Sequence, residues 1–180
     1  MVDKKVLLHI CCAPCATVGI ETLKKEQCEI EGYFFNPNIY PKEEYQKRLL
    51  SAQKLSKILD IGLITEEYKP EEWKKTVKGM EKEKEGGQRC AECFRFRLEA
   101  TAKKAKEKSM PNFTTTLTLS PHKNEKLINY IGQEIGERYS INFLKYDFKK
   151  DNGFQKSVTL SKQYDIYRQS YCGCEFGKSI

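Results

Sequence analysis

The stretch Lys5-Val6-Leu7-Leu8-His9-Ile10-Cys11-Cys12-Ala13-Pro14-Cys15 decides the fold of this chain. Residues 5–12 form an almost unbroken apolar run, which is typical of a strand buried on both faces of a sheet. Pro14 ends the strand because proline lacks the N–H that a sheet ladder requires, and residues 16–25 then have a helical pattern. The stretch therefore predicts a buried strand that passes directly into a helix, with cysteines at the junction.

The same alternation of strand and helix continues along the chain. Apolar or β-branched runs predict further strands at residues 29–36, 61–68, 112–119 and 141–146. Amphipathic stretches predict further helices at residues 43–60, 71–80, 94–108, 123–139 and 157–168. Such alternation indicates an α/β fold, in which helices cover both faces of a parallel sheet. With no internal repeat or linker, we expect a single domain over residues 1–180 that ends in a cysteine-bearing C-terminal extension.

Composition narrows the class of protein. The chain has 180 residues, of which 39% are hydrophobic and 11% aromatic, enough for a packed core and too many for a disordered chain. Its net charge of +7 favours a polyanionic partner such as nucleic acid, although a lysine-rich soluble surface gives the same value. The longest apolar run, near residues 6–13, is too short for a membrane span or a signal peptide. We therefore expect a cytoplasmic protein with no membrane partner.

Seven of the eight cysteines fall into three clusters, which are Cys11-Cys12-Ala13-Pro14-Cys15, Cys90-Ala91-Glu92-Cys93 and Cys172-Gly173-Cys174. Cys28 stands alone and is interpreted as an ordinary thiol. Cytoplasmic proteins rarely use structural disulfides, so the clusters indicate metal ligands or redox-active thiols. Two CxxC pairs suffice for a zinc ion or for an iron–sulfur cluster. Because seven thiols exceed the four that one such site needs, we expect a second metal or a redox-active dithiol beside it.

Two alternatives explain fewer of the cysteines. A four-ligand structural zinc site, as in a non-catalytic RNA-binding module, leaves three clustered thiols without a role. A thioredoxin-like dithiol formed by Cys12 and Cys15, as in a thiol–disulfide oxidoreductase, has the expected proline between its sulfurs but explains neither Cys11 nor the other two clusters. Iron–sulfur chemistry accounts for most of the set.

Three marked segments directly follow predicted strands. They are residues 11–15, 36–41 and 120–123. Ligands of parallel sheets bind beyond the carboxyl ends of the strands. We therefore expect these segments, which are distant in sequence, to converge on one side of the molecule.

Several blocks of the sequence resemble the cobalamin-independent epoxyqueuosine reductases. The matching blocks are Leu7–Cys15, Phe35–Pro41 with Glu44, Tyr45 and Arg48, Arg89–Phe94 with Arg97 and Leu98, Thr115–Lys123, and Tyr167–Cys174. The resemblance implies a fold similar to adenine-nucleotide alpha-hydrolase-like (HUP) domains, with strand order 3-2-1-4-5. It also implies reduction of epoxyqueuosine to queuosine at the wobble position of tRNA, by two-electron removal of the epoxide oxygen. The electron donor is not identified by the sequence.

The resemblance also implies roles for the clustered cysteines. A 4Fe–4S cluster would be held by Cys11, Cys12, Cys90 and Cys93. A redox-active pair or an additional iron ion would then involve Cys172 and Cys174, with Cys15. The family pattern leaves open which thiol serves which centre.

Six polar side chains are candidates for substrate binding, namely Asn36, Asn38, Tyr40, Arg89, His122 and Arg168. The first three would line a nucleoside pocket, although Asn-Pro-Asn is also ordinary turn chemistry. The arginines suit phosphate groups, which guanidinium binds through two parallel hydrogen bonds. His122 follows a predicted strand end and would contact the tRNA or transfer protons. The other histidine, His9, lies within an apolar strand and is expected to be a hydrogen-bonded core residue.

Overall fold

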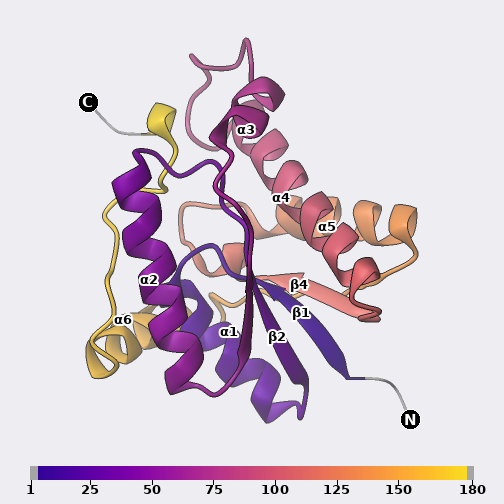
Figure 1. Ribbon diagram of the computed structural model, residues 1–180, viewed down its shortest axis with the longest axis vertical. Coiled ribbons are helices and arrows are strands. Elements are labelled where there is room, and N and C mark those ends of the chain that lie inside the picture. The colour runs from indigo at the N-terminus through magenta and orange to yellow at the C-terminus, as the bar shows by residue number, and fades with distance from the viewer. Residues whose placement is uncertain (1–3, 178–180) are drawn as a thin grey trace.

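A computed structural model describes residues 4–177 of the chain, which form a parallel sheet between two layers of helices (Figure 1). The strands are β1 (Lys5–His9), β2 (Glu29–Phe34), β3 (Gly62–Thr65), β4 (Asn112–Thr115) and β5 (Asn142–Phe143). Their order is β3-β2-β1-β4-β5, and every pairing between neighbours is parallel. The expected α/β class is therefore confirmed, as is the strand order that the resemblance implied.

Helices cover both faces of the sheet. They are α1 (Ala13–Lys25), α2 (Lys42–Ile58), α3 (Pro70–Thr76), α4 (Gln88–Glu107), α5 (Glu125–Tyr139) and α6 (Gly153–Gln163). Helix α1 packs against α2 and α6, and α4 packs against α5 on the other side of the sheet (Figure 1). Short 3₁₀ turns at Thr116–Leu119 and Glu175–Gly177 complete the fold. No helix within residues 4–177 is long and apolar enough to cross a membrane.

Strand β1 is the centre of the hydrophobic core. Val6 and Leu8 pack with the side chains of α1 and α2, whereas Leu7 packs with those of α4 and α5. All three are fully buried. This division follows from the two-residue period of a strand, which sends alternate side chains to opposite faces. The unbroken apolar run therefore supplies core residues to both helical layers.

Three helices begin three or more residues earlier than the sequence pattern predicted, and one of them is α6, which starts at Gly153 rather than at residue 157. Helix α1 starts at Ala13 rather than at residue 16, and Pro14 lies in its first turn. Proline fits there because the N–H groups of the first turn have no partner within the helix, so the N–H that proline lacks is not needed. Helix α4 starts at Gln88 rather than at residue 94. As a result, Cys15 and Cys90 lie in the first turns of helices, and Cys93 lies in the second turn of α4, rather than in loops.

Other boundaries also differ from the prediction. Strand β4 ends at Thr115, whose hydroxyl accepts a hydrogen bond from the Leu117 N–H at 3.2 Å and turns the chain into a 3₁₀ helix. Helices α3 and α6 end at Thr76 and Gln163, before residues 80 and 168. Asp165 has a positive φ of 48°, which a helix does not allow. The segment after α6 is therefore an extended tail rather than the end of a helix.

Candidate functional site

A large cavity lies at the carboxyl end of the sheet. Its volume is about 1120 Å³, and its walls include residues of all three marked segments. The predicted convergence of these segments is therefore confirmed. All seven clustered cysteines face this cavity, namely Cys11, Cys12, Cys15, Cys90, Cys93, Cys172 and Cys174. Cys28 lies elsewhere, against the core between α1 and β2.

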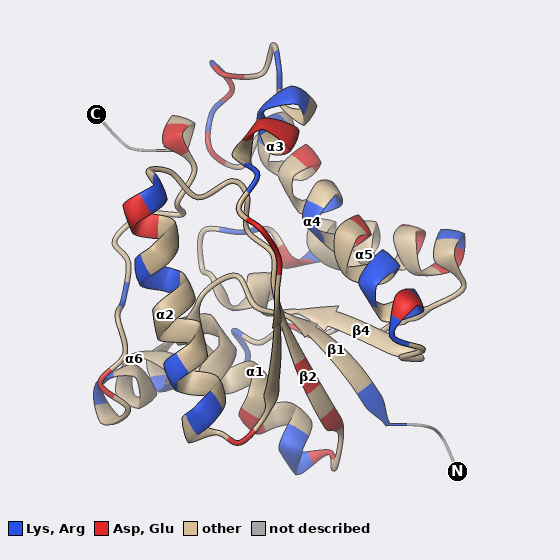
Figure 2. Cartoon of the chain, in the orientation of Figure 1, with Lys and Arg blue, Asp and Glu red and all other residues tan. Residues whose placement is uncertain are grey.

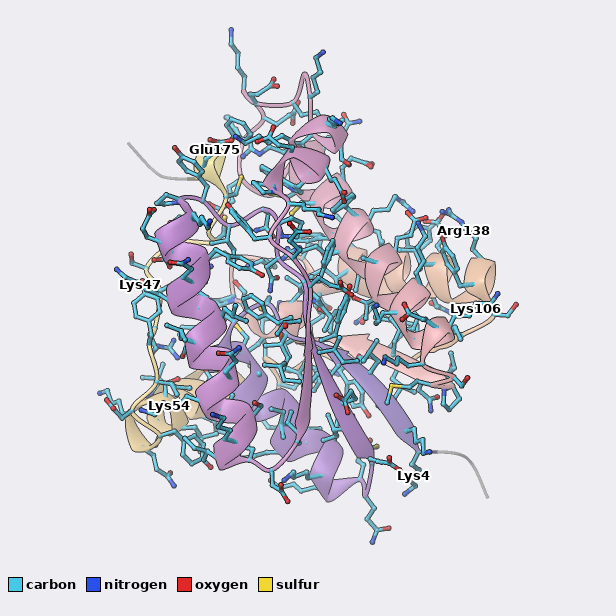
Figure 3. All side chains as sticks on the ribbon, viewed as in Figure 1. Lys4, Lys47, Lys54, Lys106, Arg138 and Glu175 are labelled. Atoms are coloured by element: carbon cyan, nitrogen blue, oxygen red, sulfur yellow. The ribbon has the colours of Figure 1, made fainter. Side chains whose placement is uncertain are left out.

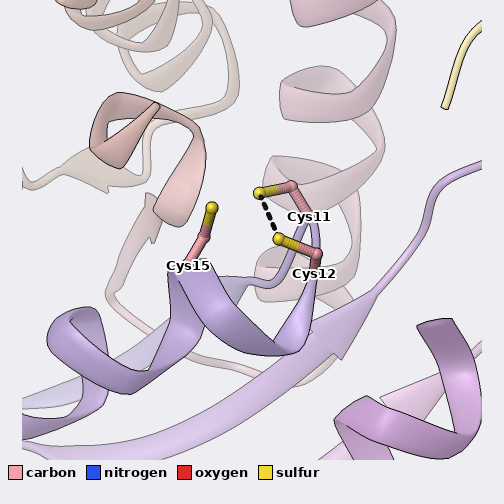
Figure 4. Close-up of side chains that lie close together, drawn as sticks. All are labelled: Cys11, Cys12 and Cys15. Carbon is pink, nitrogen blue, oxygen red and sulfur yellow. Dashed lines mark hydrogen bonds between the residues drawn. The ribbon is translucent and has the colours of Figure 1, made fainter. Parts of the chain in front are cut away.

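Three of these thiols form a close group at the junction of β1 and α1 (Figure 4). The sulfurs of Cys11, Cys12 and Cys15 all lie within 4.8 Å of one another, and those of Cys11 and Cys12 are 3.9 Å apart. The strand ends beside Cys11, and Cys15 follows in the first turn of α1. Among the described residues, this is the only set of three or more Cys, His, Asp or Glu side chains close enough to share one metal ion.

Hydrogen bonds make Cys11 the most acidic thiol of this group. Bonds from Cys12 and Cys15, and the positive charge of Lys123, hold the pKa of Cys11 well below its usual value. The hydroxyl of Thr116 lies 3.3 Å from the Cys11 sulfur and also accepts from the Cys11 N–H at 3.1 Å. The bond with Cys11 correspondingly raises the pKa of Cys12 to about 11. Cys11 is therefore the thiol of this group that loses its proton most readily.

The other four clustered thiols come from α4 and the C-terminal tail. Cys93 and Cys174 are buried and pack with Trp73, with Cys172 against the same cluster. The sulfur of Cys90 accepts a hydrogen bond from the Gly86 N–H at 3.2 Å. A hydrogen bond from Cys174 lowers the pKa of Cys172 to about 6. All these thiols are free rather than joined in disulfides.

The positions of the thiols can be compared with the needs of a single zinc ion and of an iron–sulfur cluster. Cys11 and Cys12 belong to the first group and Cys90 and Cys93 to the second, and all four face the same cavity. A single zinc ion needs its four ligands close together, whereas an iron–sulfur cluster offers ligand positions on separate irons. Within the described residues, the four expected ligands therefore do not form one close set of the kind that a single zinc ion requires. The structure adds that Cys15 lies closest to Cys11 and Cys12.

A buried ion pair holds the segment that carries Cys172. The guanidinium of Arg48 donates to the carbonyl oxygens of Cys172 and Tyr171, each at 3.0 Å, and to the Glu44 carboxylate at 2.8 Å. The hydroxyl of Tyr167 donates to the same carboxylate at 2.9 Å. Helix α2 thereby fixes the position of the tail. Sequence reasoning assigned no role to Glu44 or Arg48, although their spacing of four residues on a helix signals a possible ion pair.

Gly173 is required where the tail meets α2. Its φ is +104°, a conformation that side chains disfavour, and a Cβ atom there would lie 2.7 Å from Arg48 Nη1. The carbonyl oxygen of Gly173 accepts from the Tyr40 N–H at 2.8 Å. The residue between Cys172 and Cys174 must therefore be glycine for the tail to adopt this backbone conformation beside Arg48.

The candidate substrate residues divide into two sets. The residues that line the cavity are Asn38, Arg89, His122 and Arg168. Asn36 and Tyr40 do not line it. The amide of Asn36 is buried between the Ile10 carbonyl oxygen and Arg97, at 2.9 and 3.2 Å. Tyr40 is 44% exposed, and its backbone binds the tail. Asn36 and Tyr40 therefore hold parts of the chain together. The Asn-Pro-Asn pattern predicted a turn but not these contacts.

The two candidate arginines already have protein partners. Arg89 is buried, and its guanidinium donates to the carbonyl oxygens of Met80, Glu81 and Glu83, which anchors the loop before α4. Arg168 is half-buried and donates to Ser157 and Ser161 of α6 at 3.2 and 3.1 Å. Their contact with phosphate stays a prediction.

His9 is the hydrogen-bonded core residue that the sequence indicated. Its ring is fully buried, with Nδ1 2.9 Å from the Thr115 hydroxyl and Nε2 3.2 Å from the Phe35 carbonyl oxygen. Burial lowers its pKa to about 4, and the nearby charge of Arg97 adds to this effect. His9 is therefore a neutral residue that ties the ends of β1, β2 and β4 together.

Solved structures share this fold. A structure from Methanocaldococcus jannaschii, described as a predicted subunit of tRNA methyltransferase, superposes with a TM-score of 0.58 and 13% identity. The match covers 86% of this chain and 75% of that one. At this identity the likeness extends to the fold alone.

Relatives with much higher identity are epoxyqueuosine reductases. The QueH protein of Streptococcus pyogenes serotype M1 is 41% identical over 99% of this chain and 72% of its own length. That of Thermotoga maritima is 40% identical over 95% of this chain and 88% of its own. The model of the family described as "Epoxyqueuosine reductase QueH" matches residues 6–179. The chain therefore belongs to the epoxyqueuosine reductase QueH family of oxidoreductases.

Proposed function

We propose that this protein reduces epoxyqueuosine to queuosine in tRNA, with a 4Fe–4S cluster and an adjacent redox centre. The observation that carries the proposal is the convergence of seven thiols on one cavity in a member of this family. The reaction takes two electrons and two protons, breaks both carbon–oxygen bonds of the epoxide, and leaves an alkene and water. Thiols beside a substrate cavity are suited to such electron transfer.

The proposed cluster ligands are Cys11, Cys12, Cys90 and Cys93. When bound, a 4Fe–4S cluster supplies electrons at a potential set by its protein surroundings. Hydrogen bonds within the chain lower the pKa of Cys11 and so favour its thiolate, which is the form that binds metal. The Thr116 hydroxyl then keeps that sulfur at a fixed position beside α1.

The second redox centre would be formed by Cys172 and Cys174, with Cys15 nearby in the same cavity. As a dithiol, Cys172 and Cys174 release two electrons and two protons when they form a disulfide, which balances the epoxide reduction. An external electron donor, of a kind still to be identified, would then restore the thiols. The alternative that these residues hold an additional iron ion would instead give a metal site for the epoxide oxygen.

The substrate would enter with its modified base removed from the anticodon stack, since the thiols lie inside the cavity. Asn38 supports this proposal because its Oδ1 is buried in the cavity wall without a hydrogen-bond partner. His122 is exposed at the cavity rim and Lys123 is half-buried there, where they would meet tRNA phosphates. Arg89 and Arg168 would support the same anticodon phosphates from the cavity wall.

Purification without oxygen tests the proposal directly. Iron, sulfide and zinc are measured with a visible spectrum, and tRNA carrying epoxyqueuosine is then assayed for queuosine by mass spectrometry. About four irons with matching sulfide, and formation of queuosine, are the expected results. One zinc ion without sulfide would instead indicate the non-catalytic RNA module. A metal-free protein that forms a mixed disulfide through Cys12 or Cys15 would indicate a thiol–disulfide oxidoreductase.

A further inference from the structure

The side chain of Gln169 links the C-terminal tail to the first cysteine group. It lies in the extended segment after α6, is half-buried and lines the cavity. Its Nε2 donates a hydrogen bond to the sulfur of Cys12 at 2.9 Å, across 157 positions of sequence. This is a contact between a neutral amide donor and a sulfur that belongs to the proposed set of cluster ligands.

The other end of the same amide has no partner. Gln169 Oε1 is buried and makes no hydrogen bond within the described chain. Six buried side-chain atoms of the described residues share this property, and four of them belong to residues of the cavity wall, namely Asn38, Trp73, Arg89 and Gln169. Buried polar atoms are normally satisfied, so a concentration of unsatisfied ones around one cavity points to a ligand that supplies the missing partners.

Two of these four atoms are acceptors. They are the amide oxygens of Asn38 and Gln169, whereas the atoms of Trp73 and Arg89 are N–H donors. A ligand with hydroxyl or amine hydrogens would satisfy the oxygens. The cavity therefore selects a donor-bearing group beside the thiols.

We propose that Gln169 is a positioning residue that couples the substrate to the Cys12 sulfur, through its N–H on the sulfur side and its oxygen on the substrate side. The inference deepens the proposed function and rests on it. Hydrogen bonds to ligand sulfurs raise the potential of an iron–sulfur cluster, because they stabilise the more negative reduced state. The same residue would thus set the potential and hold a hydroxyl or amine group of the substrate.

Two variants separate these roles. Gln169→Met has a similar length and loses both the donor and the acceptor. Gln169→Glu keeps an acceptor oxygen and loses the N–H toward Cys12. Gln163→Met is the matched control, because Gln163 is exposed at the end of α6 and does not line the cavity. Thermal unfolding of each variant reports whether the fold is intact.

The measurements are the midpoint potential of the anaerobically purified, iron-loaded protein and the KM and kcat for tRNA carrying epoxyqueuosine. We expect a lower potential in both Gln169 variants, and a KM raised about three- to tenfold in Gln169→Met but less in Gln169→Glu. An unchanged potential or an unchanged KM in loaded Gln169→Met overturns the inference while the proposed function stands. A wild-type protein without iron and sulfide overturns both.

Discussion

The role of an individual side chain at this site follows from the groups that it contacts as well as from its residue type. Arg48 shows this most clearly, because one guanidinium binds a carboxylate of its own helix and two carbonyl oxygens of the distant tail. The side chains of Arg48 and Glu44 are only 2% and 9% exposed. A charge buried this deeply is tolerated when all its partners are present, and it becomes costly when one is removed.

Replacing Arg48 by Met is therefore expected to destabilise the protein by about 3–5 kcal/mol, because the Glu44 carboxylate stays buried without its counter-charge. Chemical denaturation measures this change. The control is Lys54→Met, at a residue of α2 that is labelled in Figure 3. It breaks an exposed ion pair between Lys54 and Asp165, which follows α6. Since those side chains are 46% and 98% exposed, the control should cost less than about 1 kcal/mol. Equal losses in the two variants would show that the Arg48 pair is not a buried anchor.

The cysteines of the tail give a second prediction at this scale. Cys174→Ala is expected to abolish turnover yet keep most of the bound iron, because Cys174 lies outside the four proposed cluster ligands. Iron content and the single-turnover yield of queuosine are the measurements. Cys28→Ser serves as the control, since Cys28 is remote from the cavity and should keep both iron and activity. Full activity in Cys174→Ala would contradict the proposal that Cys174 belongs to a second redox centre.

At the scale of elements, the two helices that carry cysteines begin without side-chain caps. Neither Cys12 before α1 nor Gly87 before α4 makes a side-chain capping bond. Helices α2, α3 and α6 also lack such a cap, and among the described α-helices only α5 has one, in which the Asn124 side chain accepts from the Leu127 N–H at 3.2 Å. Uncapped N–H groups and the positive end of the helix dipole favour nearby negative charge. These helix ends therefore suit thiolates in the cavity.

The packing of α5 onto β5 yields an element-scale prediction. Gly136 lies where α5 meets the chain entering β5, and a Cβ atom there would be 2.7 Å from the Ile141 carbonyl oxygen. Alanine normally favours a helix over glycine by about 1 kcal/mol, but this contact involves backbone that cannot easily move. Gly136→Ala should therefore lower the unfolding free energy by about 1–3 kcal/mol. Glu137→Ala, on the exposed side of the same helix, should change it little. A stabilised Gly136→Ala would contradict the close packing.

For the whole molecule, positive charge is spread rather than gathered. Figure 2 shows Lys and Arg interleaved with Asp and Glu along α4, whereas the acidic residues of α2 lie only in its first turn and the rest of that helix carries basic ones. Basic residues therefore occur on several elements of the fold. The cavity rim, with Lys123 beside the cysteines, is the position where a phosphate contact would place a tRNA base near the thiols.

Binding of tRNA should accordingly weaken as salt concentration rises. Lys123→Gln is expected to reduce the slope of log K against log salt by about 0.7–0.9, the change for one lost phosphate contact. Fluorescence titration over a range of salt concentrations measures the slope. Lys25→Gln, at the opposite end of α1 from the cysteines, is the charge-matched control and should leave it unchanged. If the slope of log K against log salt is the same in both variants, Lys123 does not contact a tRNA phosphate.

The sequence by itself determined the class of the fold and the kind of chemistry. The apolar run before Cys11 specified a buried central strand, and alternating periodicities specified a parallel sheet. Those signals are local, so they were reliable for the middle of each element. They were less reliable at the ends, where Pro14 opened a helix and Asp165 followed the end of one.

Only the tertiary structure decided which thiols lie together and what holds them. Cys15 joins Cys11 and Cys12, and Cys93 packs with Cys174. The bonds of Arg48 and Gln169 to distant partners left no periodic trace in the sequence. The physical reason is that periodicity records which face of one element is buried. Contacts across more than a hundred residues depend on how the elements pack around the sheet.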